Sequence, residues 1–209
     1  MNALPKNQKK RAYHHGDLEH ALIEAALETI REEGVQALTL RRVGSRAGVS
    51  RTALYRHFDD KAALLARVAA EGFRVLYETM ARAIANSSPE RGDTLEVMAA
   101  GYVHFALSNP AHYQTMFGGY LTEWERHPDL IRHADAAFNQ LVDVIRSEQE
   151  QGHIGAGSPV VAAEIVWSLT HGVATLGLAG HLPRTETSAE ELAVRGSHFL
   201  RTGMQATAW

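Results

Sequence analysis

Apolar side chains recur every three or four residues along most of the chain, which is the spacing of an amphipathic α-helix. No segment shows the strict alternation that is typical of a half-buried strand. The pattern predicts long or medium helices over these segments: 17–33, 61–85, 93–108, 111–118, 128–151, 158–180 and 188–205. With two short helices near the N-terminus, the sequence predicts an all-α protein of about nine helices, three in an N-terminal part and six in a C-terminal part.

Capping residues mark where several of these helices begin. Ser158 precedes a proline in the first turn, an arrangement that favours a helix start. Asp93 with Glu96, and Ser188 with Glu191, have the spacing of a capping box, in which each side chain bonds the other residue's backbone N–H. We therefore expect capped starts at all three helices.

Residues 39–58 contain two very short helical patterns on either side of a glycine turn. Thr39 and Ser50 are placed to cap the two helices, and Gly48 stands where the chain must turn in a left-handed conformation. Helices this short are unstable alone in water, so they must be held by packing. The pattern favours a helix-turn-helix, whose second helix enters the DNA major groove.

The second helix of this motif has an apolar face and a polar face. Leu54 and Phe58 share one face and are expected to be buried. The opposite side presents two neighbouring rows that suit phosphates and base edges: Arg51 with Tyr55, and Thr52 with Arg56. Residues 39–58 hold five arginines and no acidic residue, which favours DNA binding. The alternative is a solvated charged face on an ordinary helical hairpin.

Charge is distributed unevenly along the chain. The net charge is −3, which by itself does not indicate nucleic-acid binding. Through Lys61, however, eleven Lys and Arg stand against eight Asp and Glu, whereas the remainder has ten against sixteen. A basic N-terminal part and an acidic C-terminal part direct the attractive field to one place. Residues 1–12 form an expected basic arm that either enters a minor groove or stays a solvated tail.

Several classes of protein are disfavoured. The chain has no cysteine, which fits a reducing cytoplasm, and no apolar run of membrane-spanning length is expected. The start lacks the apolar core of a secretory leader. Motifs of nucleophilic hydrolases, nucleotide-binding loops and zinc proteases are missing, and the twelve histidines form no metal-ligand spacing. We expect no enzymatic activity, no cofactor and no metal site.

The N-terminal part resembles the DNA-binding domain of the tetracycline-repressor (TetR/AcrR) family of bacterial regulators. The similarity runs from Tyr13 to Phe73 and is carried by HHGDLEHALIEAALETIREEG, LTLRRV, RAGVS and LYRHFDDKAALL. One departure is Gly44, where the family usually has alanine. The resemblance implies a homeodomain-like helix-turn-helix domain over 13–60, joined by a long helix to an effector-binding and dimerisation domain over 61–209.

The resemblance also implies roles for individual residues. Family positions that usually touch phosphates match Thr39, Ser50, Tyr55, His57 and Lys61, and those that usually face base edges match Arg51 and Thr52. Arg41, Arg42 and Arg56 are additional candidates on charge alone. Lys61 has an alternative role beside Asp59 and Asp60 at a helix start, and His57 has one as a packed imidazole.

The segment 158–180 is apolar almost all round and contains several glycines, which permit close helix packing. The family usually dimerises through its last two helices, so the resemblance implies a homodimer that binds a near-palindromic double-stranded operator. The alternative is a central core helix. Trp167, His171 and Gly172 also resemble the Trp-His-Gly (WHG) type of C-terminal domain in this family. Trp167 and His171 lie on one helix face, lining either a pocket or the dimer interface.

Aromatic, His and Met side chains concentrate between residues 104 and 124. Such a cluster suits an apolar pocket with a few polar groups. With the Trp-His pair, the candidate effector residues are His104, Phe105, Tyr113, Met116, Phe117, Trp124, Trp167 and His171. The alternative is that these are ordinary core and surface side chains.

The sequence as a whole predicts a cytoplasmic transcriptional regulator, a repressor released from DNA by a small hydrophobic effector. In an alternative, the C-terminal domain only dimerises or binds a protein partner. A third hypothesis, a small-molecule enzyme, has no motif to support it.

Overall fold

The computed structural model describes residues 15–87, 92–182 and 187–206. Within these ranges the chain forms nine α-helices and two 3-10 helices and no strand, which confirms the predicted all-α class. The chain divides into two compact units, Met1–Lys61 and Ala62–Trp209, called here the N-terminal and C-terminal units. The expected basic arm, residues 1–12, lies outside the described residues.

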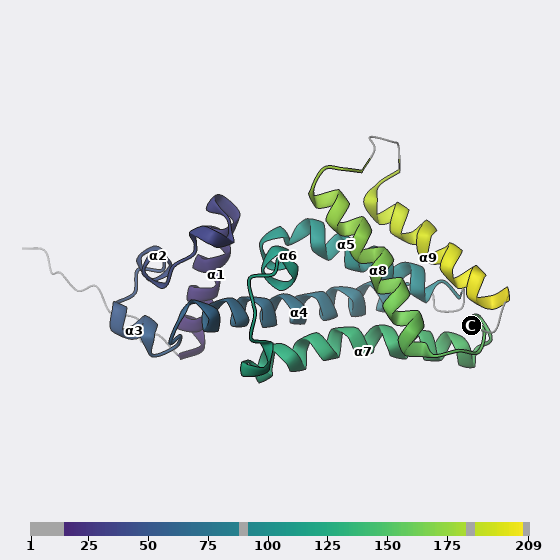
Figure 1. Cartoon of the computed structure of the whole chain (residues 1–209), viewed down its shortest axis with the longest axis horizontal. Helices are drawn as coiled ribbons and strands as arrows, with labels where there is room; N and C mark the ends of the chain where they lie inside the picture. Colours follow the sequence, from purple (N-terminus) through teal and green to yellow (C-terminus); the bar gives the residue numbers. More distant parts are fainter. Residues whose placement is uncertain (1–14, 88–91, 183–186, 207–209) are drawn as a thin grey trace, which may run out of the picture. The chain divides into compact units, whose positions relative to one another are not determined.

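The N-terminal unit contains α1, a 3-10 helix η1, and the short helices α2 and α3 (Figure 1). Their bounds are His15–Glu33, Val35–Ala37, Leu40–Arg46 and Arg51–Tyr55. α1 ends where Gly34 takes a φ of 83°, and α2 packs against both α1 and α3. The short helices are therefore held by tertiary contacts, as their length requires.

The predicted signals of the helix-turn-helix motif are confirmed. The Arg42 backbone N–H donates to Thr39 Oγ1 at 3.2 Å, and the Ala53 N–H donates to Ser50 Oγ at 3.2 Å. Gly48 takes a φ of 66° between the two helices. Leu54 and Phe58 are buried, which turns the opposite side of α3 outward.

In its described residues the C-terminal unit comprises the helices α4 to α9 (Figure 1) and the 3-10 helix η3. α5 packs against α7, α8 and α9, and α8 packs against α7 and α9. α4 begins at Lys61, so it starts at the last residue of the N-terminal unit. The bounds are α4 Lys61–Ala85, α5 Thr94–Ser108, α6 Pro110–Phe117, η3 Trp124–Arg126, α7 Pro128–Glu150, α8 Pro159–Leu178 and α9 Ala189–Ala206.

The capping predictions in this unit are confirmed at Ser158, confirmed in part at Ser188 and wrong at Asp93. Ser158 accepts a hydrogen bond from the Val161 N–H. Ser188 accepts one from the Glu191 N–H, but the Glu191 carboxylate pairs with Arg195 instead of reaching back. The box at the start of α5 is wrong, because Asp93 makes no side-chain cap bond and Glu96 is buried against α9.

α8 is long and apolar enough to span a membrane by length and composition, contrary to the expectation that no such run exists. The core helix of a soluble protein passes the same test, and one such helix is weak evidence of a span. Ala162, Ala163, Val166 and Ala174 on α8 are buried in the core of the C-terminal unit. We therefore interpret α8 as a core helix with an additional exposed apolar side.

Candidate functional site

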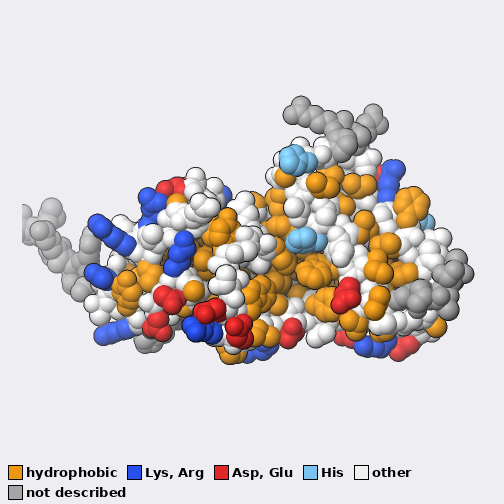
Figure 2. Space-filling view, in the orientation of Figure 1, with side chains coloured by type: hydrophobic (Ala, Val, Ile, Leu, Met, Phe, Trp, Pro, Cys, Tyr) orange, Lys and Arg blue, Asp and Glu red, His pale blue; other side chains and the backbone are white. Residues whose placement is uncertain are grey.

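The outward side of α3 is a candidate nucleic-acid interface. Arg51, Thr52, Tyr55 and Arg56 are all exposed. The Arg51 guanidinium carbon lies 5.4 Å from the centre of the Tyr55 ring, so the two side chains of this row support each other. Figure 2 shows Lys and Arg side chains gathered over the part of the N-terminal unit that carries α2 and α3. This surface presents guanidinium groups, hydroxyls and an aromatic ring together.

The arginines of α2 differ in their ion pairs and hydrogen bonds. Arg41 is exposed, whereas Arg42 pairs with Glu33 at 2.7 Å and donates to the Ala37 carbonyl at 3.2 Å. Arg46, which was not among the predicted contacts, is bound by two carboxylates of α1, Glu28 and Glu32. Part of the positive charge of the motif therefore fixes α2 onto α1.

The remaining residues predicted to contact phosphates either bond other groups of the protein or are partly buried. The hydroxyls of Thr39 and Ser50 cap α2 and α3. Lys61 Nζ donates to the carbonyls of Val35 at 3.2 Å and Gln36 at 3.4 Å. Neither of the two roles expected for Lys61, a phosphate contact or a partner of Asp59 and Asp60, includes these bonds. His57 is half-buried, with its ring centre 6.4 Å from that of Phe58.

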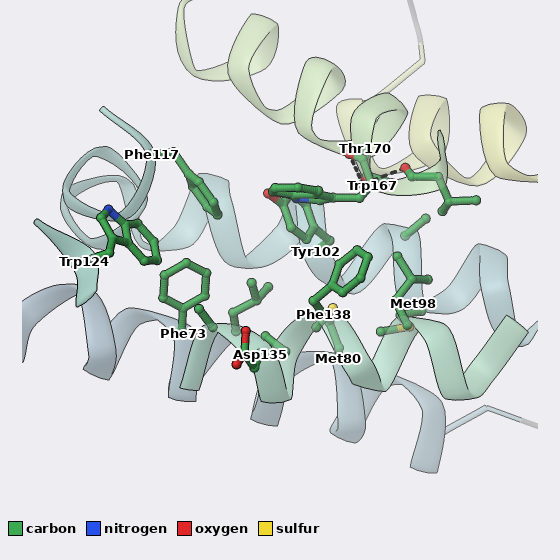
Figure 3. A pocket seen from close by; sticks show the side chains of 16 residues that line it. Phe73, Met80, Met98, Tyr102, Phe117, Trp124, Asp135, Phe138, Trp167 and Thr170 are labelled. Atoms are coloured by element: carbon green, nitrogen blue, oxygen red, sulfur yellow. Dashed lines mark hydrogen bonds between the residues drawn. The ribbon is translucent and has the colours of Figure 1, made fainter. Parts of the chain in front are cut away.

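The C-terminal unit encloses an apolar cavity of about 340 Å³, within the size range of small-molecule sites. Side chains of α4, α5, α6, η3, α7 and α8 surround it, and most are aromatic or aliphatic (Figure 3). The sixteen lining residues are Phe73, Leu76, Met80, Met98, Ala99, Tyr102, Phe117, Trp124, Ala134, Asp135, Ala137, Phe138, Leu141, Val166, Trp167 and Thr170.

The predicted effector residues are only partly brought together by this cavity. Three of the eight line it: Phe117, Trp124 and Trp167. Phe105 and Met116 are buried in the core, and His104 is exposed, 3.9 Å from Glu190. Tyr113 and His171 lie behind the wall, where their rings stack with centres 5.5 Å apart.

A hydrogen-bond network supports the wall of the cavity. The hydroxyls of Tyr102 and Tyr113 each lie 2.9 Å from His171 Nδ1, and Trp167 Nε1 donates to the Tyr102 hydroxyl at 3.3 Å. Burial lowers the pKa of the His171 imidazole and raises the pKa of both tyrosine hydroxyls. Burial thus favours the neutral imidazole of His171, whose Nδ1 contacts both tyrosine hydroxyls and so helps to orient Tyr102 and, through it, Trp167.

Sequence reasoning missed several lining residues, among them Phe73, Tyr102 and Phe138. Each belongs to a helix whose apolar face is mostly core, and helical spacing is the same for a side chain that fills the core and one that borders a cavity. The aromatic cluster drew attention to α6 and η3 but carried no signal for the facing helices.

Comparison with known proteins places both units in one family. Residues 22–68 match the bacterial regulatory proteins of the tetR family, and residues 95–199 match the tetracyclin repressor-like C-terminal domain. An uncharacterized HTH-type transcriptional regulator, YobS, from Bacillus subtilis (strain 168) is 25% identical over 181 residues, covering 86% of this chain and 88% of that protein.

Solved structures agree with this assignment. A protein with unknown function from Rhodococcus sp. RHA1 is 28% identical, with a TM-score of 0.81, over 93% of this chain and 99% of that one. The TetR family transcriptional regulator PfmR from Thermus thermophilus is 21% identical, with a TM-score of 0.66, over 87% of this chain and 97% of that one. At this identity the similarity to PfmR shows the fold alone.

A capped helix-turn-helix with an exposed basic face, followed by a helical unit with an apolar cavity, defines a DNA-binding transcriptional regulator. The C-terminal match alone covers half of the chain, and the chain belongs to the tetR family of bacterial regulatory proteins. Proteins of this family bind DNA operators and act as dimers. The resemblance stated from the sequence is thus confirmed, while the Trp-His-Gly subtype stays a prediction.

Proposed function

We propose that this protein is a cytoplasmic homodimeric repressor that binds a near-palindromic double-stranded operator and leaves it when a small hydrophobic effector occupies the cavity. The outward side of α3 carries the proposal, because Arg51, Thr52 and Tyr55 are exposed on a helix whose other side is buried. That exposure is what insertion into a major groove requires.

In this proposal the contacts divide into two kinds. Arg51 and Thr52 contact base edges and therefore determine which sequence is bound. The phosphate contacts, which fix the position of the protein on the duplex, come from Thr39, Ser50, Tyr55, His57 and Lys61, supplemented by Arg41, Arg42 and Arg56. Because phosphate contacts release counterions, affinity for DNA should fall steeply with salt.

The proposed dimer forms through α8 and α9. Val161, Ile165 and Leu176 on α8 are exposed, as are Leu192 and Phe199 on α9, and Phe199 is 75% exposed. A Cβ atom built on Gly172 meets nothing within 4 Å, so a neighbouring helix has room to approach α8 there. A two-fold axis through this surface would relate two recognition helices, which in such dimers contact half-sites about 34–36 Å apart.

Coupling between effector and DNA is proposed to run through α4. Phe73, Leu76 and Met80 of α4 line the cavity, and the same helix begins at Lys61. A ligand that favours one position of α4 would favour one spacing of the two recognition helices, and DNA would favour another.

DNA binding can be tested with two substitutions that probe the two kinds of contact. Once bound sequences have been selected from a random pool, Arg51→Ala should cost about 1–3 kcal/mol of binding free energy and relax base preference. Lys61→Ala should weaken all sequences alike and lower the salt slope by about one. Gel-shift titrations at several salt concentrations measure both effects.

Arg146→Ala, an exposed arginine on α7 in the C-terminal unit, is the matched control and should leave DNA binding unchanged. Because Lys61 also bonds two carbonyls, its variant is compared at a temperature well below its measured unfolding midpoint. Unchanged operator binding in both the Arg51 and Lys61 variants would refute the assignment of the α3 surface.

A further inference from the structure

Among the residues that the structure describes, the one charged side chain bordering the cavity of the C-terminal unit is a carboxylate. The sixteen lining residues include no Lys, Arg or His, and Asp135 is the single carboxylate among them. An anionic group that entered the cavity would lose its water without gaining a cationic partner, which is unfavourable. The lining therefore selects against anionic ligands.

Three further polar side chains of the lining, Thr170, Trp167 and Tyr102, already have partners. The Thr170 hydroxyl donates to the carbonyls of Val166 and Trp167, both at 3.0 Å. Trp167 Nε1 donates to the Tyr102 hydroxyl, which itself lies against His171. A ligand that is rich in hydrogen-bonding groups would have to break these bonds, so most of the cavity suits an apolar body.

Asp135 differs from these groups. It is exposed on α7, and its carboxylate forms no ion pair with any residue that the structure describes. The basic residue one turn earlier on the same helix, Arg132, pairs instead with Asp129 at 3.0 Å. The carboxylate is therefore available to a positive charge at the edge of the cavity.

The lining is rich in aromatic rings, which also favours a cation. Phe73 meets Phe117 and Trp124 edge-on, with ring centres 5.5 and 5.9 Å apart, and Phe138 meets Trp167 edge-on at 6.0 Å. In each pair one ring presents its edge to the face of the other, and the electron-rich faces of aromatic rings attract cations that come near them. Figure 3 shows these side chains converging on the same space from several helices.

We infer that the effector of this protein is a hydrophobic cation, with an apolar body among the aromatic side chains and an ammonium-type charge held near Asp135. This inference rests on the proposed function and narrows it from a hydrophobic molecule to one of defined charge. The preference depends on Asp135, whereas the affinity for the apolar body depends on the rings.

Three probes of nearly the same shape separate these contributions. They are a phenylbutyl trimethylammonium cation, its neutral tert-butyl isostere, and a phenylalkyl carboxylate of matched length. Trp124 and Trp167 line the cavity and are two of the three tryptophans of the chain, so their fluorescence reports binding. Titrations are made on the full-length Trp209→Phe protein, which removes the third tryptophan, and operator release is followed in parallel by gel shift.

The cation should bind roughly tenfold more tightly than the neutral isostere, and the carboxylate more weakly than either. Asp135→Asn should remove most of that preference while leaving the affinity for the neutral probe unchanged. Asp143→Asn, the same change at an exposed position of α7 outside the cavity lining, is the control and should change nothing. High salt should reduce the cation preference, because Asp135 is exposed.

Two failures can be told apart. If the neutral probe or the carboxylate binds as tightly as the cation and releases the operator, the charge preference is refuted and the effector-responsive function stands. Equal effects of Asp135→Asn on all three probes would refute it as well. If no probe changes the fluorescence or releases the operator, both proposals fail, and a C-terminal unit that only dimerises or binds a protein partner is favoured.

Discussion

Glu96 lies on α5 and is 4% exposed, yet it carries a carboxylate into the contact with α9. Arg201 Nε donates to its Oε1 at 2.8 Å, and His198 Nδ1 lies 3.2 Å from the same oxygen. Within the described part of the chain Oε2 has no hydrogen-bond partner. Because this carboxylate is buried and one of its oxygens lacks a hydrogen bond, its stability in the folded protein depends strongly on the nearby Arg201 guanidinium.

We therefore expect Arg201→Ala to be strongly destabilising. Removing the guanidinium leaves the Glu96 carboxylate buried without compensation, at a cost of about 3–5 kcal/mol of the free energy of unfolding. Urea unfolding at a fixed protein concentration measures this loss. The double variant Glu96→Leu/Arg201→Met should recover most of it, because no charge is then buried.

Arg195→Ala is the matched control on the same helix. Arg195 pairs with Glu191 one turn away, but both side chains are largely exposed, so the loss should be below about 0.5 kcal/mol. Equal losses in the Arg195 and Arg201 variants would contradict the special role of burial at Glu96.

At the scale of a single element, the helix-turn-helix motif contains two glycines with opposite requirements. Gly44 is inside α2, where an added Cβ would lie 3.5 Å from Leu54 Cδ1, an ordinary contact distance. Gly48 has nothing within 4 Å of such an atom, but its φ of 66° disfavours any side chain. Space permits both substitutions, and backbone conformation permits only one.

Gly44→Ala should accordingly stabilise the protein by about 0.5–1 kcal/mol through helix propensity, and Gly48→Ala should destabilise it by about 1 kcal/mol. The two variants serve as controls for each other, since both add one methyl group within four residues of the same turn. Thermal unfolding followed by circular dichroism gives the sign of each change. Shifts of the same sign in both would show that backbone conformation at residue 48 does not decide the outcome.

The elements that sequence predicted best are those set by local chemistry. α4 begins and ends at the predicted residues, and the caps at Thr39, Ser50 and Ser158 form as expected. The three-residue helices η1 and η3 were not predicted, because so short a segment has no measurable apolar period. The capping box at Glu96 failed because a distant partner on α9 outcompetes the local bond.

The candidate sites show the same contrast between features set by local sequence and features set by distant contacts. The exposure of the α3 rows followed from helical spacing alone. The cavity did not, because it is a place where side chains from six elements fail to fill space, and no local pattern encodes that mismatch. Lys61 shows the same difficulty, since its bonds to Val35 and Gln36 join residues that are far apart in sequence.

At the scale of the whole molecule, α8 and α9 together expose an apolar surface, which is unfavourable in water unless another protein surface packs against it. Large apolar side chains exposed together on two neighbouring helices are typical of an interaction site. Hydrophobic side chains appear over the α8 region in Figure 2. Association of two copies through this surface would bury them.

Ile165→Glu should therefore convert a dimer into a monomer, since it places a charge within that apolar surface at a cost of several kcal/mol of association energy. Sedimentation equilibrium over a range of concentrations measures the change. Tyr77→Glu on α4 is the control, because Tyr77 is 41% exposed and Ile165 is 44% exposed but Tyr77 lies outside α8 and α9. A variant at Ile165 that stays dimeric would place the interface elsewhere.

The cavity wall is formed by α4 together with five other elements, and this division affects how such a regulator can come to respond to a new compound. Phe73, Leu76 and Met80 sit on the helix proposed to move the recognition surface, so mutations there alter sensing and signalling together. The remaining lining residues belong to other elements of the C-terminal unit, so mutations there alter ligand recognition without altering α4. Natural variation among those positions can retune which compound is detected while the output stays intact, so relatives that share a switch need not share an inducer.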